Sequence, residues 1–370
     1  MSPPAAARPL SADRLAKALA ALPPLDGADV VGRHLSSTPD TVTWGWMPAG
    51  GDGAVLEVAP GDVVTVDTVS HEGILGDQGR DPVRFFGGFG VPADAVLADA
   101  VAIAAGDLPH DPLVNGPHVV TGPIAVTGAR PGDVLSVTVL DLVPRVPYGI
   151  VSTRHGLGAL PGEVIGDDPV ASAFCLVEDG VGTIALRGDD PERRVRFPLA
   201  PFLGFTGVAG PARIHSVAPG RHGGNIDVRL LGIGSTLHLP VAVPGALLGV
   251  GDPHFAQGDG EVALTAFEAP LRATLRLDLV PAAAVPERFG TLTGPLGETP
   301  ELWIPIGLDP DLDEAMRDAV RRSLDLLGHR YGMDRRQAYA YLSVATDYAV
   351  SQVVDGTKGV HGTIRKADFG

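Results

Sequence analysis

The sequence is poor in the residue types that mark redox proteins and nucleic-acid-binding proteins. Its single cysteine, Cys175, has no partner for an intramolecular disulfide, and it excludes a cysteine-rich zinc site. Cys175 stands in the apolar run ASAFCLVEDG, and because reactive thiols need a polar setting, we interpret it as a buried structural residue. The formal charge is −16 at pH 7, without any basic run. Nucleic-acid affinity comes largely from cations that neutralise phosphates, so no nucleic-acid partner is predicted.

Long apolar runs are missing as well. No uninterrupted run approaches the ~20 residues that span a bilayer. The opening segment MSPPAAARPLSADRLAKALAALPP has no apolar core of the signal-peptide type. We therefore expect a cytoplasmic protein without a membrane partner. In the same segment Ser11 is placed to cap a short helix that ends at Pro23 and Pro24.

Glycine and proline, in contrast, are abundant, with 49 and 34 residues, and they separate short apolar runs. Residues 54–69 and 124–143 alternate between apolar and polar side chains around a Pro-Gly-Asp sequence at 60–62 and at 131–133. Residues 236–252 repeat this design more loosely. A period of two marks β-strands, and Pro-Gly-Asp favours a tight connection. We interpret these runs as β-hairpins of a sandwich or barrel.

The chain changes to helical patterns after Val280. Asp309 and Pro310 are expected to begin a helix that runs through DLDEAMRDAVRRSLDLLGHRYG, and Asp334 with Gln337 resembles a capping box for a second helix. The predicted fold class is thus mainly β, sandwich- or barrel-like, with a smaller α+β part near the C-terminus. The predicted division is an N-terminal tail with a short helix (1–29), a β-rich domain (30–145), a β-rich domain that carries the site (146–285), and an α+β part with a helical hairpin (286–370).

Two segments between the β-runs, 70–118 and 145–170, are rich in glycine and polar residues. Long ordered loops on β scaffolds often build binding sites. The GGFG sequence at 87–90 has no strand before it and no helix after it, so it does not predict a phosphate-binding loop. Neither a G-x-S-x-G elbow nor an H-E-x-x-H sequence occurs, and serine-hydrolase and zincin chemistry therefore lack their motifs.

Side chains able to bind a metal or move a proton concentrate between residues 221 and 268. Asp252 and His254 are two apart and share one face of an extended strand, and Glu261 follows a Gly-Asp-Gly turn. Imidazole nitrogens and carboxylate oxygens suit a divalent ion, and a carboxylate beyond the ligands can act as general base on an activated water. We predict zinc, with calcium as the alternative, and Glu261 as the base. The predicted metal ligands are His222, Asp227, Asp252, His254 and His118.

Other polar residues have simpler interpretations. His238 and Asp259 are expected at the surface and in a turn, and His155 and His215 are expected to be structural. For the pair at 71–72, His-Glu, a solvated loop is favoured over a place in the site. The evidence for His118 is balanced between a place in the cleft and a structural role, because it opens the strand VVTGPIAV.

Several segments together resemble the acetamidase/formamidase family. They are HGGNID, PVAVPGALLGVGDPHFAQGDGE, GPHVVTGPIAVTGARPGDVL and YLSVATDYAVSQVVDGTKGVHGTIRK, and the likeness runs from about residue 55 to the C-terminus. The resemblance implies a β-rich fold, hydrolysis of a short-chain amide to a carboxylate and ammonia with the help of a metal, and a homodimer or larger homo-oligomer. The residues that match the family's motifs are His222, Asn225, Asp227, Asp252, His254, Gln257, Glu261 and His118.

The chain also departs from the family's pattern. Pro253 stands where a larger apolar residue is expected, and Trp44 and Trp46 lie in an N-terminal segment that matches poorly and is placed to reshape the substrate mouth. The predicted function is a metal-dependent amidohydrolase in which Glu261 moves the proton and Gln257 or Asn225 positions a small amide. The alternatives are a hydrolase of the same fold that acts on a bulkier or cyclic amide, and a non-catalytic β-sandwich that binds a ligand or metal.

Overall fold

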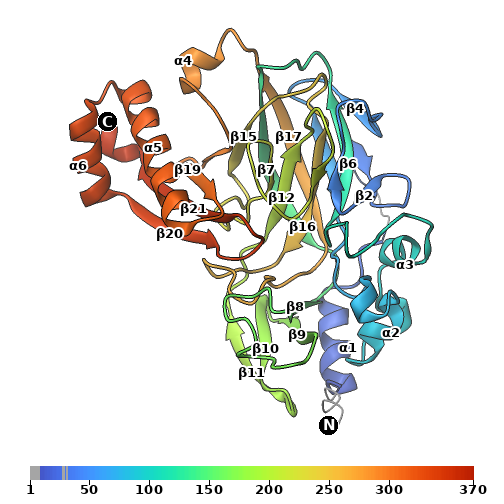
Figure 1. Ribbon diagram of the computed structural model, residues 1–370. Helices are drawn as coiled ribbons and strands as arrows, with labels where there is room; N and C mark the ends of the chain where they lie inside the picture. Colours follow the sequence, from blue (N-terminus) through green and yellow to red (C-terminus); the bar gives the residue numbers. More distant parts are fainter. Residues whose placement is uncertain (1–8, 27–29, 31) are drawn as a thin grey trace.

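The computed structural model describes residues 9–26, 30 and 32–370, and it shows two β-sheets packed face to face with smaller parts at their edges (Figure 1). Part of the expected N-terminal tail, residues 1–8 and 27–29, lies outside the described residues. One sheet has nine strands, in the order β1 (Arg33–Leu35), β5 (Val63–Asp67), β17 (Leu271–Val280), β7 (Val134–Pro144), β15 (Thr236–Pro240), β18 (Leu296–Glu298), β19 (Leu302–Asp309), β21 (Lys358–Arg365) and β20 (Asp347–Gln352).

The second sheet has six strands and carries most of the functional side chains. Its central strands β12 and β16 are buried along their whole length. Side chains on these two strands therefore lie in surroundings that hold little water. Its members are β14 (Gly223–Asn225), β12 (Phe202–Val208), β16 (Leu248–His254), β6 (Val119–Val126), β2 (Val42–Trp44) and, beside β6, β4 (Leu56–Val58).

The main hydrophobic core fills the space between the two sheets. On β17 the alternate residues Leu271, Ala273, Leu275 and Leu277 are completely buried, as the period of two requires for a strand with one face toward a core. Ile124, Leu248 and other residues of the six-stranded sheet belong to the same cluster. The mainly β, sandwich-like prediction is confirmed.

The hairpin prediction, however, is wrong, because each Pro-Gly run connects the two sheets. β4 and β6 lie in the six-stranded sheet and lead into β5 and β7 of the nine-stranded sheet, while β15 leads back into β16. Alternation shows that both flanking strands face one core, and a connection between layers satisfies this pattern as well as a hairpin does. The local chemistry is as expected: the carboxylates of Asp62 and Asp133 accept hydrogen bonds from the backbone amides of Ala59 and Arg130, at 2.9 and 2.8 Å.

A third, four-stranded sheet lies at one end of the sandwich, next to helix α1 (Ala12–Ala21) (Figure 1). The expected N-terminal helix is confirmed, and Arg14 joins it to Glu178 of this sheet at 2.6 Å. Short helices occupy much of the segment 70–118, which the sequence predicts as loop. The elements of this region are β8 (Tyr148–Arg154), β9 (Val170–Glu178), β10 (Val181–Arg187), β11 (Asp190–Phe197), α2 (Pro82–Gly87), α3 (Ala98–Ala105), and the 3-10 turns η1 (Gly76–Gln78) and η2 (Ala93–Ala95). A separate two-stranded sheet consists of β3 (Trp46–Met47) and β13 (Ile214–His215) and packs against residues of the six-stranded sheet.

The C-terminal part contains the expected helical hairpin, α5 (Leu312–Tyr331) and α6 (Arg335–Ala345), followed by the paired strands β20 and β21. Asp334 caps α6 as predicted. The cap of α5 is Asp311 and not Asp309, because β19 continues through Asp309. The remaining elements are α4 (Val285–Phe289) and η3 (Lys366–Phe369).

Strands from all three predicted segments 30–145, 146–285 and 286–370 contribute to the nine-stranded sheet. The division into domains stays a prediction. Among the described residues, no helix combines the length and the apolar character that a bilayer crossing requires.

Helix α5 packs so closely on β19 that the sheet needs a glycine there. A Cβ atom on Gly307 would overlap the carbonyl oxygen of Ala315 and the amide of Ala319. We expect Gly307→Ala to lower the free energy of unfolding by about 1–3 kcal/mol, through overpacking. Gly328 lies on α5 itself, and a Cβ atom there would meet its nearest neighbour at 3.7 Å. We expect Gly328→Ala to raise the free energy of unfolding by up to about 1 kcal/mol, because alanine has the higher helix propensity. Urea unfolding of both variants tests this pair, and equal effects would contradict the packing account.

Candidate active site

Buried acidic and histidine side chains converge at one edge of the six-stranded sheet. Strand β16 ends in Asp252 and His254, β6 begins just after His118, and the turn between β20 and β21 brings in Asp355. All of these residues are buried except Asp355, which is half-buried. The cluster, called the carboxylate–histidine cluster below, consists of His71, His118, Asp227, Asp252, His254, Glu261, Glu268 and Asp355.

The backbone that presents this cluster is held in an unusual conformation. Asp227, Asp252 and Glu261 have φ angles of 44°, 50° and 47°, in the left-handed region that non-glycine residues seldom occupy. Residues held in such sparsely populated conformations concentrate at functional sites, and each costs about 1–3 kcal/mol. Three acidic residues of one cluster share this feature, which points to a requirement for the direction of their side chains.

Gly204 on β12 leaves the space into which the carboxylates point. A Cβ atom at this position would stand 2.5 Å from Oδ1 of Asp227 and 2.5 Å from Oδ2 of Asp252. Any other residue would therefore push these carboxylates apart.

Asp252 lies at the centre of the cluster. Its Oδ2 is 3.1 Å from Nε2 of His254, which is also 2.9 Å from Oε1 of Glu268. Its Oδ1 is 3.6 Å from Nδ1 of His71 and 3.8 Å from Nε2 of His118. One carboxylate thus connects three imidazoles.

The electrostatics of the cluster divide the carboxylates into two kinds. Burial, followed by the charge of Asp252, raises the pKa of Asp227 well above its usual range, and burial together with Asp227 does the same for Glu261. Burial and the charge of Asp252 also raise the pKa of Asp355, to about 8. For Asp252 itself burial acts in the same direction, but the neighbouring charges of His254 and His118 hold its pKa well below the usual range.

His118 is a neutral imidazole in this setting. Burial lowers its pKa to about 4. Its Nδ1 is 3.0 Å from the hydroxyl of Ser216, which leaves Nε2 directed toward Asp252. A hydrogen-bond partner that orients the ring of a histidine in this way is typical of metal-binding imidazoles.

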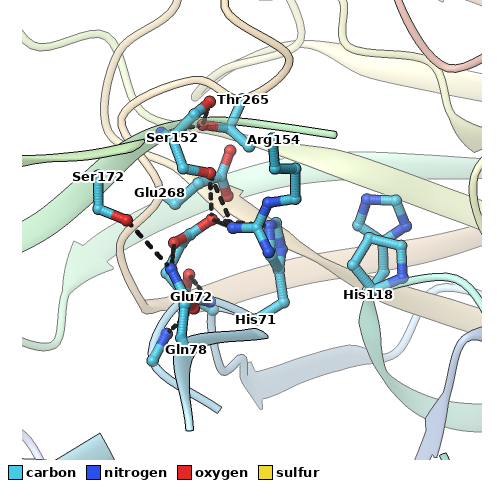
Figure 2. A network of polar contacts seen from close by, with 12 residues as sticks. His71, Glu72, Gln78, His118, Ser152, Arg154, Ser172, Thr265 and Glu268 are labelled. Carbon is cyan, nitrogen blue, oxygen red and sulfur yellow. Dashed lines mark hydrogen bonds and ion pairs between the residues drawn. The ribbon is translucent and has the colours of Figure 1, made fainter. Parts of the chain in front are cut away.

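A network of charges behind His71 fixes its position (Figure 2). Glu72 is paired with Arg154 and accepts a hydrogen bond from the hydroxyl of Ser152 at 2.7 Å. His71 places Nε2 3.3 Å from Glu72 and Nδ1 toward Asp252. Burial opposes the charged form of His71, but these two carboxylates raise its pKa to about 10. A cationic His71 therefore supports Asp252 from the rear of the site.

The cluster fits a divalent cation. Buried polar atoms without a hydrogen-bond partner carry a free-energy cost, and this cluster holds several: both carboxylate oxygens of Asp227, Oε2 of Glu261 and of Glu268, and Nδ1 of His254. The ligand atoms of Asp227, Asp252 and His254 all lie within 4.8 Å of one another, as do those of Asp227, Glu261 and Asp355. Oxygen and imidazole donors at this spacing suit zinc or calcium.

The structure brings together five of the residues that the sequence singles out: His118, Asp227, Asp252, His254 and Glu261. His222 lies outside the groups able to hold an ion, half-buried, with its ring against Gly220 and Gly224. Its role as a ligand stays a prediction.

The two predicted positioning amides differ in their surroundings. Asn225 lines the cavity of the site, donates to Oδ2 of Asp355 at 3.0 Å, and has no partner for its own Oδ1. Gln257 donates to the backbone oxygens of Asp227 and Ser351, at 2.8 and 3.2 Å. It therefore holds the backbone of the cluster together.

Sequence reasoning missed three members of the cluster: His71, Glu268 and Asp355. The expected solvated pair His71–Glu72 is wrong, since the two residues are 3% and 2% exposed. The burial of Glu72 and of the adjacent His71 depends on Arg154, which pairs with Glu72 and is distant in the sequence. Asp355 had one signal, its place in the motif VVDGTKG, and Glu268 had only its position at the end of the stretch 221–268.

Two further expectations need correction or completion. His238 is completely buried, not at the surface, and it contacts the Ser136 hydroxyl and Glu298, each at 2.8 Å. Asp259 pairs with Arg229 at 2.9 Å. Neither residue belongs to the cluster.

A cavity of about 810 Å³ opens beside the cluster. His71, Asp252, Glu261, Glu268 and Asp355 line its inner end. The two tryptophans that were expected at the substrate mouth lie one layer further back. Trp44 stacks on His110 and Trp46 packs edge-on against His215, with ring centroids 4.3 and 5.2 Å apart, and both histidines line the cavity.

Because Gly204 provides the space for two of the carboxylates, we expect Gly204→Ala to disturb ion binding. The new methyl group would displace Asp227 or Asp252, and purified protein should hold much less divalent metal than the wild type. Gly51→Ala, where no atom lies within 4 Å, is the matched control. Elemental analysis together with the melting temperature checks the result. Full metal content in a folded Gly204→Ala protein would contradict this geometry.

Known proteins that are similar to this chain are acetamidases and formamidases, in agreement with the motifs. The model of the acetamidase/formamidase family matches residues 205–289, the region that holds most of the cluster. The acetamidase of Mycolicibacterium smegmatis is 28% identical over 303 residues, which is 62% of this chain and 73% of the relative. The formamidase of Methylophilus methylotrophus is 26% identical over 205 residues, 39% of this chain. The chain spans about half the length, 47%, of that protein and of one other curated relative.

The likeness extends to the fold. The crystal structure of an acetamidase from Bacillus halodurans superposes with a TM-score of 0.70 at 25% sequence identity, and the match covers 91% of this chain and 98% of that one. The motifs, the family model over residues 205–289 and the shared fold together show that this chain is similar to the acetamidases and formamidases.

Proposed function

We propose that the chain is a metal-dependent amidohydrolase that releases ammonia from an amide. The observation that carries the proposal is the carboxylate–histidine cluster, whose buried ligand atoms lack partners and which forms the inner end of a cavity. Relatives named acetamidase and formamidase support the reaction class.

Asp227, Asp252 and His254 would hold the cation, with His118 next to Asp252 as a further ligand. When bound, the ion would polarise the amide carbonyl and lower the pKa of a water molecule. Calcium prefers six to eight oxygen ligands, whereas zinc readily accepts imidazole nitrogen. The imidazoles of His118 and His254 therefore favour zinc, with calcium as the alternative.

Glu261 is the residue best placed to move the proton. Its carboxylate belongs to two of the groups that could hold an ion. One group contains His254 and Glu268, and the other contains Asp227 and Asp355. Burial keeps the pKa of Glu261 high, so the carboxylate is a stronger base than an exposed glutamate. It would accept the proton of the attacking water and deliver it to the leaving nitrogen.

Asn225 would position the amide. The residue lines the cavity, and its Oδ1, which has no partner, would accept a hydrogen bond from the NH₂ group of the substrate, while its amide nitrogen donates to Asp355. Gln257 would act indirectly, through the backbone of Asp227. Leaving nitrogen and proton donor would then lie on the same side of the site.

Replacing Glu261 tests the assigned base. We expect Glu261→Gln to lower kcat by about 10²–10⁴-fold, because general acid–base catalysis contributes that range. Ammonia release from a panel of amides measures the effect, and Glu163→Gln, an exposed loop position, serves as control. A variant that keeps both its metal and its wild-type kcat would overturn the role of Glu261.

Removing the metal tests the requirement for an ion. Exhaustive chelation should abolish ammonia release, and one divalent metal should restore it. The metal that restores activity at stoichiometric concentration identifies the native ion. Full activity in protein shown to be metal-free would sink the mechanism and leave a non-catalytic or metal-independent protein. The homo-oligomeric state and the cytoplasmic location stay predictions, and light scattering tests the first of them.

A further inference from the structure

The cavity is lined by two chemically different groups of residues. Members of the carboxylate–histidine cluster form the group that we call the inner end, and aliphatic side chains form much of the remainder, which we call the aliphatic end. A volume of about 810 Å³ is in the range of sites that enclose drug-sized ligands, of roughly 300–1,000 Å³. The carbonyl of acetamide carries only a methyl group, which leaves the aliphatic end unused. The aliphatic residues include Leu75, Leu113, Leu157, Val217, Leu264 and Val354.

Leu264 is held in this wall by an unusual backbone conformation. Its φ angle is 100°, in a region that residues with a Cβ atom rarely adopt, and its amide donates to the carbonyl of Glu261 at 3.2 Å. Glu261 itself has a positive φ, and both side chains line the cavity. One tight turn therefore directs the assigned base and a leucine into the same space.

The neighbouring loop fixes this turn from outside. The amide of Ala159 donates to the carbonyl of Val262 at 2.9 Å, and a Cβ atom at Gly158 would approach that carbonyl to 3.2 Å. This close contact joins the segment with Leu157 to the segment with Leu264. The two leucines thus line the cavity from two segments that this contact joins, with Leu157 on the more exposed side.

We propose that the substrate is an amide with a bulky apolar group, such as a phenyl or branched alkyl group, and that Leu264 determines this specificity. The inference rests on the proposed function. The amide would bind at the cluster, and the hydrocarbon would fill the aliphatic end, where burial of apolar surface favours it over a methyl group. Strain at Leu264 is retained because it places the side chain beside the reacting group.

The test compares two amides and two carboxylates that differ only in the apolar group. Ammonia release gives kcat/KM for phenylacetamide and for acetamide, and calorimetry gives the affinity for phenylacetate and for acetate. The metal-containing wild type should prefer the phenyl compound in both measurements, by about tenfold or more, since one methylene in an apolar pocket discriminates by roughly 10–200-fold.

Leu264→Gly tests the residue without threatening the fold, because glycine adopts a φ of 100° readily. The preference for the phenyl compound should fall by about tenfold or more in both the kinetic and the calorimetric ratio. Leu160→Gly is the matched control, an exposed leucine in the neighbouring loop that does not line the cavity. Its ratios should equal those of the wild type.

The outcomes separate the two proposals. Wild-type protein that releases ammonia but shows no preference for the phenyl compound overturns the inference and leaves the amidase standing. An unchanged preference in Leu264→Gly overturns the role of Leu264. Tighter binding of phenylacetate, lost in Leu264→Gly and without ammonia release from any amide, supports the aliphatic subsite and overturns the proposed reaction.

Discussion

The structure depends on the burial of more carboxyl groups than the neighbouring cationic side chains can pair with. Asp227, Asp252, Glu261, Glu268 and Asp355 meet within one cluster. Ionised carboxylates in such surroundings are strongly unfavourable unless they are paired or bind a metal. The raised pKa values of Asp227 and Glu261, and the lowered pKa of Asp252 next to its imidazoles, are two responses to this constraint.

The two sheets and the C-terminal part hold these buried carboxyl groups in place. The three Pro-Gly runs connect the two sheets around one core, and β12 and β16 are buried along their whole length. Gly204 on β12 provides the only kind of backbone that leaves space for two carboxylates. The C-terminal part contributes directly, because the turn between β20 and β21 supplies Asp355 and thus completes one side of the cluster.

Local patterns in the sequence predicted much of the fold and most of the cluster residues that lie between 221 and 268. Alternation identified the strands, the capping residue Asp334 identified α6, and the pair Asp252 and His254 fell on one strand end as expected. The helical pattern identified α5, although its cap is Asp311 and not the predicted Asp309. Alternation does not say which sheet a strand joins, which explains the error over the hairpins. His71 and Asp355 were missed for a related reason: their burial depends on Arg154 and on Asn225, more than 80 residues away in the chain.

The cavity constrains the substrate in two ways. Its inner end determines which reaction takes place, and its aliphatic end determines which substrates fit. Two residues of one turn, Glu261 and Leu264, connect the two ends through their left-handed backbone. Small rearrangements of this turn would therefore alter catalysis and selectivity together.

The central claim is that a cation belongs among these buried carboxylates. Anomalous diffraction from crystals of the purified protein, recorded on both sides of the zinc absorption edge, tests it most directly. The account predicts an anomalous peak between the side chains of Asp227, Asp252 and His254. Strong density for an ion elsewhere, for example at His222, or a cluster that binds no ion in protein crystallised with excess zinc and calcium, would contradict it.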